Sequence, residues 1–289
     1  MEELFTLYGG KVELKTIFNN QRHEYRVREA GVDKEFRLVP GPTTALGVLD
    51  KPFLVPWASK EAVKEMGWYE KEIWTPEGYL PVSEEEQAKG LERLISIKNR
   101  IETMDYDEYW DALKQAKGAH LKRKDAAADN GTLVHNWVEL WIKGKNPPMP
   151  GLPLVRKGAE AWLRFIDKAG GVSFILSEAK IYSRKHRYAG TLDFTCVIGG
   201  KLTMGDLKTS NSFSDSMFQQ VSAYQLARQE EHPEENYDQQ IIVRCGKDGT
   251  LEVVKSTEYK KDIKAFLACW VIWKRQNELK KKPYARATF

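Results

Sequence analysis

The sequence predicts an α/β protein, with a mixed central sheet flanked by helices, on two observations. Short apolar strands joined by tight turns are expected near residues 173–183, 190–198 and 201–209. Helical periodicity precedes them, from about 55 to 144, and follows them, from about 214 to 230. Strands and helices that alternate in this way form a sheet with helices packed around it.

The N-terminal segment, residues 1–54, is expected to be rich in β-structure. Residues 10–40 alternate between apolar and polar side chains, which predicts a β-meander that turns at Asn19-Asn20. The stretch "GPTTALGVLDKP" that follows predicts a loop with a short helix.

The next segment, residues 55–150, is expected to form a helical subdomain. Ser83, with an acidic residue three positions later, makes a capping box that predicts the start of a helix. A second helix start is predicted at Asp105, and "AADNGTLVHNWVELWIKG" continues a third helix. The proline-rich connector 145–153 marks the boundary to the last domain.

The last domain, residues 151–289, is expected to hold the central sheet and the catalytic core. Beyond the three strands named above, two more strands are expected near 239–245 and 250–255. Helices are expected near 156–169 and 258–281.

Composition and charge narrow the class of protein. The chain has 289 residues and a formal net charge of +4, which is mildly basic and does not by itself indicate a nucleic-acid partner. Its three cysteines favour a reducing compartment over a disulfide framework or an iron–sulfur cluster. No apolar run reaches membrane-spanning length, and the acidic N-terminus lacks the features of a signal peptide or presequence. A cytoplasmic protein without a membrane partner is therefore expected.

Two acids and a lysine stand among the apolar residues of the hairpin expected around Gly199-Gly200. This dipeptide favours a two-residue turn because both residues tolerate positive φ. Asp193 precedes the turn by six residues and Asp206 follows it by six, so their Cβ atoms are expected about 5 Å apart. Lys208 lies two residues further on and shares their face. Opposed carboxylates repel each other unless a cation lies between them, which predicts a site for Mg²⁺ or Mn²⁺.

A third acid, Glu178, extends this row if the preceding turn is centred on Lys185-His186. That turn would place Glu178 opposite Asp193, seven residues away on each side. The turn lacks a Gly or Asn signal, so an exposed strand charge is the alternative for Glu178. Acid-x-Lys triplets also recur elsewhere in the chain, and what distinguishes Asp206 is the tight turn and the opposed acid.

Two helices add further candidates. His135, in "GTLVHNWVE", is either a metal ligand or, as is commoner beside tryptophans, a packed or surface histidine. Gln220 and Tyr224 share a helix face, and they either line the site or belong to an ordinary half-buried helix.

Basic residues gather before His135 and in the loop before Asp193. Both runs would suit the phosphate backbone of DNA, and a solvated face is the alternative for each. Exposed tryptophans and tyrosines would offer base-stacking surfaces. The basic candidates are Lys122, Arg123, Lys124, Arg184, Lys185 and Arg187.

The order of these motifs resembles the PD-(D/E)XK nuclease superfamily. The resemblance rests on a strand with Asp193, a turn, a strand that ends in Asp206-Leu207-Lys208, and then Gln220-x-x-x-Tyr224. The upstream "GTLVH" is similar to the RecB/Cas4-like branch, and the chain beyond residue 40 is similar to the mitochondrial genome maintenance exonuclease family and its phage relatives. The resemblance implies a restriction-endonuclease-like core and a metal-dependent deoxyribonuclease, an exonuclease acting on single strands or DNA ends in recombination, replication or repair.

The resemblance also implies roles for single residues. Lys208 would position or activate the attacking water, with Glu178 in the same acid row, and Gln220 and Tyr224 would support the catalytic groups and the scissile phosphate. The cysteines typical of Cas4 proteins are absent, so no iron–sulfur cluster is expected. Without a presequence, a phage or bacterial source is favoured, acting in the host cytoplasm if the chain is phage-encoded. The implied ligands of one or two Mg²⁺ or Mn²⁺ ions are His135, Asp193, Asp206 and the backbone carbonyl of Leu207.

Two alternatives stay open. One is a DNA-binding or recombination accessory protein that keeps the fold without activity, although the intact acids and Lys208 argue against it. The other is a nuclease of the same fold directed at flaps or RNA. The sequence has no GxSxG elbow, Walker A sequence or HExxH, so serine hydrolase, NTPase and zincin classes have no support.

Overall fold

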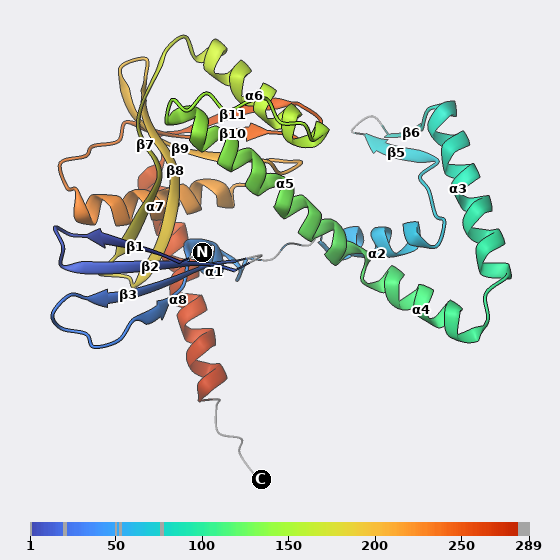
Figure 1. Ribbon diagram of the computed structural model, residues 1–289, viewed down its shortest axis with the longest axis horizontal. Helices are drawn as coiled ribbons and strands as arrows, with labels where there is room; N and C mark the ends of the chain where they lie inside the picture. The colour runs from blue at the N-terminus through green and yellow to red at the C-terminus, as the bar shows by residue number, and fades with distance from the viewer. Residues whose placement is uncertain (1, 20–21, 50, 52–53, 76–77, 283–289) are drawn as a thin grey trace. The chain divides into compact units, whose positions relative to one another are not determined.

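The computed structural model describes the chain except for residues 1, 20–21, 50, 52–53, 76–77 and 283–289. The chain forms two compact units, one of residues 1–49 and 129–289 and one of residues 50–128. Each unit is described on its own, with its elements labelled in Figure 1. In the described part of the chain, no helix combines the length and apolarity needed to cross a bilayer.

The larger unit is built on a five-stranded sheet with the order β11-β10-β9-β8-β7. Strands β9 and β10 are parallel and are joined through helix α7 (Ser216–Glu231), whereas the other neighbours are antiparallel. All five predicted strands are present, with ends within two residues of those expected. They are β7 (Val172–Ser183), β8 (Tyr188–Ile198), β9 (Lys201–Lys208), β10 (Gln239–Cys245) and β11 (Leu251–Ser256).

Helices pack on both faces of this sheet, so the predicted mixed α/β class is confirmed. One face is covered by helices whose apolar residues form one core with the sheet, for example Phe266 against Leu192. The second core, around Trp162 and Phe194, covers the other face. The first face carries α1 (Pro42–Leu46), α7 and α8 (Tyr259–Lys281), and the second carries α5 (Ala119–Ile142) and α6 (Pro153–Ala169).

A four-stranded antiparallel meander precedes the central sheet and is drawn in blue in Figure 1. Its apolar residues form a third core with Tyr182 and Ala189 of the β7–β8 hairpin. The meander begins earlier than residue 10. The turn predicted at Asn19-Asn20 falls partly outside the described residues, although Asn19 pairs with Arg22 across it. The strands are β1 (Glu2–Leu7), β2 (Val12–Asn19), β3 (Arg22–Glu29) and β4 (Arg37–Val39).

The smaller unit is mainly helical and adds a short hairpin that was not expected. The predicted helix starts are present: the Ser83 hydroxyl accepts from the backbone nitrogen of Glu86 at 3.3 Å, and Asp105 closes a full capping box with Glu108. The elements are α2 (Leu54–Glu65), β5 (Glu72–Thr75), β6 (Gly78–Pro81), α3 (Glu84–Glu102), α4 (Tyr106–Lys117) and the first part of α5.

The two units divide the chain within α5 rather than at the proline-rich connector. The second half of α5 packs Val134, Trp137 and Val138 into the core over the central sheet. Burial of these side chains joins the His135 segment to the larger unit, whereas the sequence had grouped this segment with the helical subdomain.

Candidate metal centre

The hairpin of β8 and β9 has the predicted register. Gly199 and Gly200 form its turn with φ of +56° and +75°, the left-handed conformations that a two-residue type I′ turn requires. Paired residues run from Ile198 with Lys201 to Phe194 with Gly205. One step further along this register, Asp193 and Asp206 stand side by side on adjacent strands.

The hairpin of β7 and β8 also has the predicted register, with Ser183 paired to Tyr188 and Ser177 paired to Phe194. This register places Glu178 beside Asp193. Glu178 itself has a φ of +52°, a left-handed conformation that costs a non-glycine residue about 1–3 kcal/mol.

Close to Asp193, the side chains of strand β8 switch from one core of the sheet to the other. Leu192 packs in the core with α7 and α8, and Phe194 packs in the core with α5 and α6. In a regular strand, residues two apart share a face. The hairpin is therefore twisted sharply where Glu178 and Asp193 meet, and their carboxylates lie at the junction between two cores.

His135 joins these two carboxylates from helix α5. Its Nδ1 lies 3.6 Å from Asp193 Oδ2 and 3.9 Å from Glu178 Oε1. One ligand atom from each of the three residues lies within 4.8 Å of the others. They line a cavity of about 10 Å³, which is roughly the volume that one water-sized sphere occupies. Two carboxylates and an imidazole around so small a space make a donor set for a divalent cation.

Helix α5 is held in place on both sides of His135. The indole nitrogen of Trp137 donates to the carbonyl of Pro148 at 2.9 Å. At Gly131, an added Cβ would lie 2.9 Å from the hydroxyl oxygen of Thr209, just after β9. The glycine thus allows helix α5 to approach the end of β9 closely, and this approach sets the imidazole against the sheet.

Asp206 lies beside this group but has a different partner. Its side chain is fully buried, and it forms an ion pair with the ammonium group of Lys208. Its Oδ2 contacts that ammonium group, whereas no hydrogen bond from the described chain reaches Oδ1. Burial, offset by Lys208 and reinforced by the charge of Asp193, raises the pKa of Asp206 to about 6. Asp206 is not within the 4.8 Å group, so the structure separates it from the three residues that meet most closely.

The charges of the site depend on one another. Burial alone would lower the pKa of His135, but the carboxylates of Asp193 and Glu178 outweigh it and raise that pKa. Burial and the charge of Glu178 raise the pKa of Asp193 despite the nearby imidazole. A raised pKa at Asp193, beside a second carboxylate, means that its ionised form lacks positive charge, which a divalent cation would supply.

Helix α7 brings Gln220 and Tyr224 to the Asp206 side of the site. The side-chain amide of Gln220 donates to the Tyr224 hydroxyl oxygen at 2.6 Å. Burial first, and then the charge of Asp206, raises the pKa of Tyr224. The ring fits because Gly190 has no side chain: a Cβ there would lie 2.8 Å from it.

Tyr25 of the N-terminal sheet was not among the predicted site residues. Its hydroxyl shares a 3.1 Å hydrogen bond with the hydroxyl of Thr191 on β8. Burial, with the charges of Glu178 and Asp193 adding to it, raises the pKa of Tyr25 to about 12. No local pattern links residue 25 to residue 191, because the contact forms only when the meander docks on the hairpin.

Within the larger unit, the predicted basic residues Arg184, Lys185 and Arg187 lie away from the carboxylates. Arg184 binds Glu29 through two hydrogen bonds, and Arg187 is six residues from Asp193, roughly 20 Å along an extended strand. Lys185 is exposed in the same turn. In the smaller unit, Arg123 forms ion pairs with Glu61 and Glu65, and Lys122 and Lys124 are exposed.

No protein-family model matches the chain, and no curated protein matches it significantly. What the chain does is therefore inferred from the geometry of its own residues.

Proposed function

We propose that the protein is a metal-dependent deoxyribonuclease, an exonuclease that hydrolyses phosphodiester bonds in single strands or at DNA ends. The observation that carries this proposal is the meeting of His135, Glu178 and Asp193 beside the buried Asp206 and its half-buried partner Lys208. A divalent-cation site next to a half-buried ammonium group suits a reaction in which negative charge grows on a phosphate.

The residues fit a divalent cation on two independent grounds. The three closest side chains supply oxygen and imidazole donors around a cavity of ionic size. The buried Oδ1 of Asp206 accepts no hydrogen bond within the described chain, so it has acceptor capacity for a further ligand bond. When bound, Mg²⁺ or Mn²⁺ neutralises phosphate charge and lowers the pKa of a coordinated water.

The chain's own residues contribute the rest of the chemistry. Lys208 stays charged, because Asp206 and Asp193 outweigh its burial and raise its pKa. Its ammonium group therefore stabilises the negative charge of the transition state. Tyr224 keeps its proton at neutral pH, because burial and the nearby acids raise its pKa, and so its hydroxyl serves as a neutral hydrogen-bond donor. Gln220 orients that hydroxyl by donating to its oxygen.

The order of elements supports a PD-(D/E)XK-like core for this site. Three antiparallel strands present Glu178, Asp193 and Asp206 in a row, and the crossover helix α7 then leads to a parallel strand. This arrangement agrees with the core expected from the motifs, in which the helix after the second acid bears the Gln and Tyr residues.

The test is a nuclease assay on labelled nucleic acids. The protein is incubated with linear single-stranded DNA, circular single-stranded DNA, duplex DNA and RNA, in Mg²⁺, Mn²⁺ or EDTA. The proposal predicts metal-dependent degradation of linear DNA to short products, with circles spared because they have no free end. The Asp193→Asn variant should be inactive and the matched Asp238→Asn variant active.

Three results would contradict the proposal. Degradation of RNA alone would assign a different substrate. Cutting of circles would replace the exonuclease assignment by an endonuclease. Binding of DNA without degradation in either metal would leave the accessory protein as the better description.

A further inference from the structure

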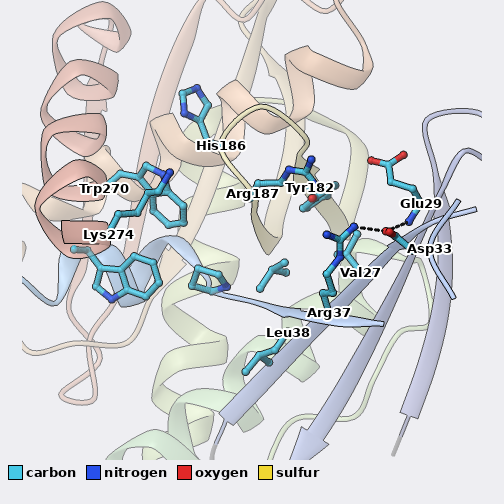
Figure 2. Close-up of a pocket in the computed structure, with 13 residues that line it drawn as sticks. Val27, Glu29, Asp33, Arg37, Leu38, Tyr182, His186, Arg187, Trp270 and Lys274 are labelled. Atoms are coloured by element: carbon cyan, nitrogen blue, oxygen red, sulfur yellow. Dashed lines mark hydrogen bonds and ion pairs between the residues drawn. The ribbon is translucent and has the colours of Figure 1, made fainter. Parts of the chain in front are cut away.

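A second, larger cavity lies apart from the candidate metal centre. It has a volume of about 380 Å³ and is lined by strands β3 and β4 with the loop between them, by the β7–β8 turn and by helix α8 (Figure 2). All of these segments belong to the larger unit. Its volume falls near the lower end of the range of about 300–1,000 Å³ typical of small-molecule sites. None of its residues lines the cavity at His135.

The inner surface of this pocket is aromatic and apolar. Trp270 and Trp273 stack on each other with ring centroids 5.2 Å apart and planes 24° from parallel. Trp270 and Tyr182 are buried, whereas Trp273 is partly exposed. Trp270 is also stacked by Phe266, so it supports Trp273 from behind, and the exposed part of Trp273 offers the stacking surface for a flat ligand. The pocket is completed on this side by Val27, Val39 and Pro40.

The charged groups of the pocket leave a surplus of positive charge. Asp33 forms an ion pair with Arg37, and Glu29 binds Arg184 outside the pocket. Among the described residues, neither Arg187 nor Lys274 forms an ion pair, and both side chains are exposed. Figure 2 shows Arg187 beside Tyr182, and Lys274 close to Trp270. Arg187 lies within electrostatic reach of Asp33, whose pKa it helps to lower, but neither it nor Lys274 is held in an ion pair within the described chain, so both are available to an anionic ligand.

The turn that presents Arg187 has an unfavourable backbone conformation. Arg187 has a φ of +62°, and its backbone nitrogen donates to the carbonyl of Ser183 at 2.7 Å. The Ser183 hydroxyl in turn donates to Glu230 at 2.7 Å and accepts from the backbone nitrogen of His186 at 3.0 Å. A strained non-glycine residue persists only where its surroundings fix it, and such residues cluster at binding sites.

We propose that this pocket binds one nucleotide, with its base against the exposed part of Trp273 and its phosphate between Arg187 and Lys274. The ligand is a free nucleoside monophosphate or the phosphorylated end of a DNA strand, which share this chemistry. The pocket would suit any flat aromatic anion, and we choose a nucleotide because of the proposed nuclease function. Binding here needs no metal, so this site gives the N-terminal meander a role that the metal centre does not require.

The test is isothermal titration calorimetry in EDTA, which keeps divalent cations from the metal centre. The ligands are dTMP, thymidine, inorganic phosphate and a short oligonucleotide with or without a 5′-phosphate. Lys274→Gln and Arg187→Gln should each weaken dTMP binding roughly tenfold, because each removes one charge-assisted contact. Lys264→Gln, which removes an exposed lysine outside the pocket on the same helix, should leave binding unchanged.

The outcomes separate this proposal from the nuclease assignment. An Asp193→Asn variant that still binds dTMP supports the pocket whatever its nuclease activity. Tighter binding of the phosphorylated oligonucleotide than of dTMP identifies a strand end as the ligand, and the reverse identifies the free nucleotide. The proposal is overturned if wild type binds neither dTMP nor the phosphorylated oligonucleotide. It is also overturned if phosphate or thymidine binds as tightly as dTMP, or if Lys274→Gln binds dTMP as tightly as Lys264→Gln does.

Discussion

The carboxylate of Asp193 accepts a hydrogen bond from the backbone nitrogen of Leu207, with 2.7 Å between Oδ2 and N. The bond ties β8 to β9 just beyond Phe194 and Gly205, the last pair of their ladder. The same oxygen lies 3.6 Å from the imidazole of His135. One carboxylate therefore links the sheet, the helix and the candidate metal site.

The Asp193→Asn substitution removes the negative charge of the side chain but keeps an oxygen that can accept the hydrogen bond from Leu207. The amide oxygen can still accept from Leu207, so the free energy of unfolding should change by about 1 kcal/mol or less. Activity should fall by more than the roughly 10- to 100-fold that loss of an outer-shell metal partner costs. Asp238→Asn is the matched control. The Asp238 carboxylate likewise accepts a hydrogen bond from a backbone nitrogen of β9, that of Leu202, at 2.8 Å. Equal activity of the two variants would contradict a metal role for Asp193.

Lys208→Gln should destabilise the protein strongly, because it leaves the buried carboxylate of Asp206 without its ion-pair partner. A loss of about 3–5 kcal/mol is expected in urea unfolding at pH 8 with EDTA, where Asp206 is ionised. The double variant Asp206→Asn/Lys208→Gln should regain much of this stability while remaining inactive. A double variant less stable than Lys208→Gln would show that Asp206 is not held as an unpaired charge.

Gly205→Ala should destabilise the sheet beneath the site. An added Cβ would lie 2.0 Å from the ring of Phe194, which is itself enclosed by Trp162 and Phe174 and has little room to move. A cost of about 1–3 kcal/mol or more is expected, measured by chemical unfolding. Adding Phe194→Leu should recover part of it. Gly151→Ala, where the new Cβ meets open space, serves as the neutral control.

The parts of the site that local sequence determines were predictable. The Gly199-Gly200 dipeptide specifies a turn, and a turn with alternating apolar strands specifies which residues face each other, so the Asp193–Asp206 register followed. Turn chemistry also sufficed for the strand ends and for the caps at Ser83 and Asp105.

The parts that depend on docking were not predictable. Pairing rules assume a regular strand, so they could not show that Glu178 takes a left-handed conformation and turns with Asp193 toward His135. Nor could they show that Asp206 pairs with Lys208 instead of joining that group. Tyr25 reaches the site across a large sequence separation, which no local pattern encodes.

Glu235 gives a prediction for the pH dependence of stability. Burial tends to raise its pKa, but hydrogen bonds from Arg228 and Tyr237 outweigh burial and lower it. A lowered folded-state pKa means that Glu235 stabilises the fold above its unfolded pKa of about 4.3, and that this stability disappears as pH falls through the folded value.

Glu235→Gln should therefore cost about 1–3 kcal/mol at pH 7, and the difference from wild type should shrink as the pH is lowered below about 4. Urea unfolding at a series of pH values measures it. Glu234→Gln, which changes a neighbouring exposed acid, should alter the free energy of unfolding by no more than about 0.5 kcal/mol. A difference for Glu235→Gln that persists unchanged in acid would contradict the assigned contacts.

Whether one divalent cation is shared by His135, Glu178 and Asp193 is measured most directly by Mn²⁺ binding, followed by electron paramagnetic resonance at neutral pH without nucleic acid. Wild type should bind Mn²⁺ saturably, and His135→Gln, Glu178→Gln and Asp193→Asn should each weaken that binding at least tenfold. The matched Asp238→Asn variant should bind as wild type does. Saturable binding that survives all three substitutions, or no binding to wild type at millimolar Mn²⁺, would contradict the metal centre and the nuclease proposal that depends on it.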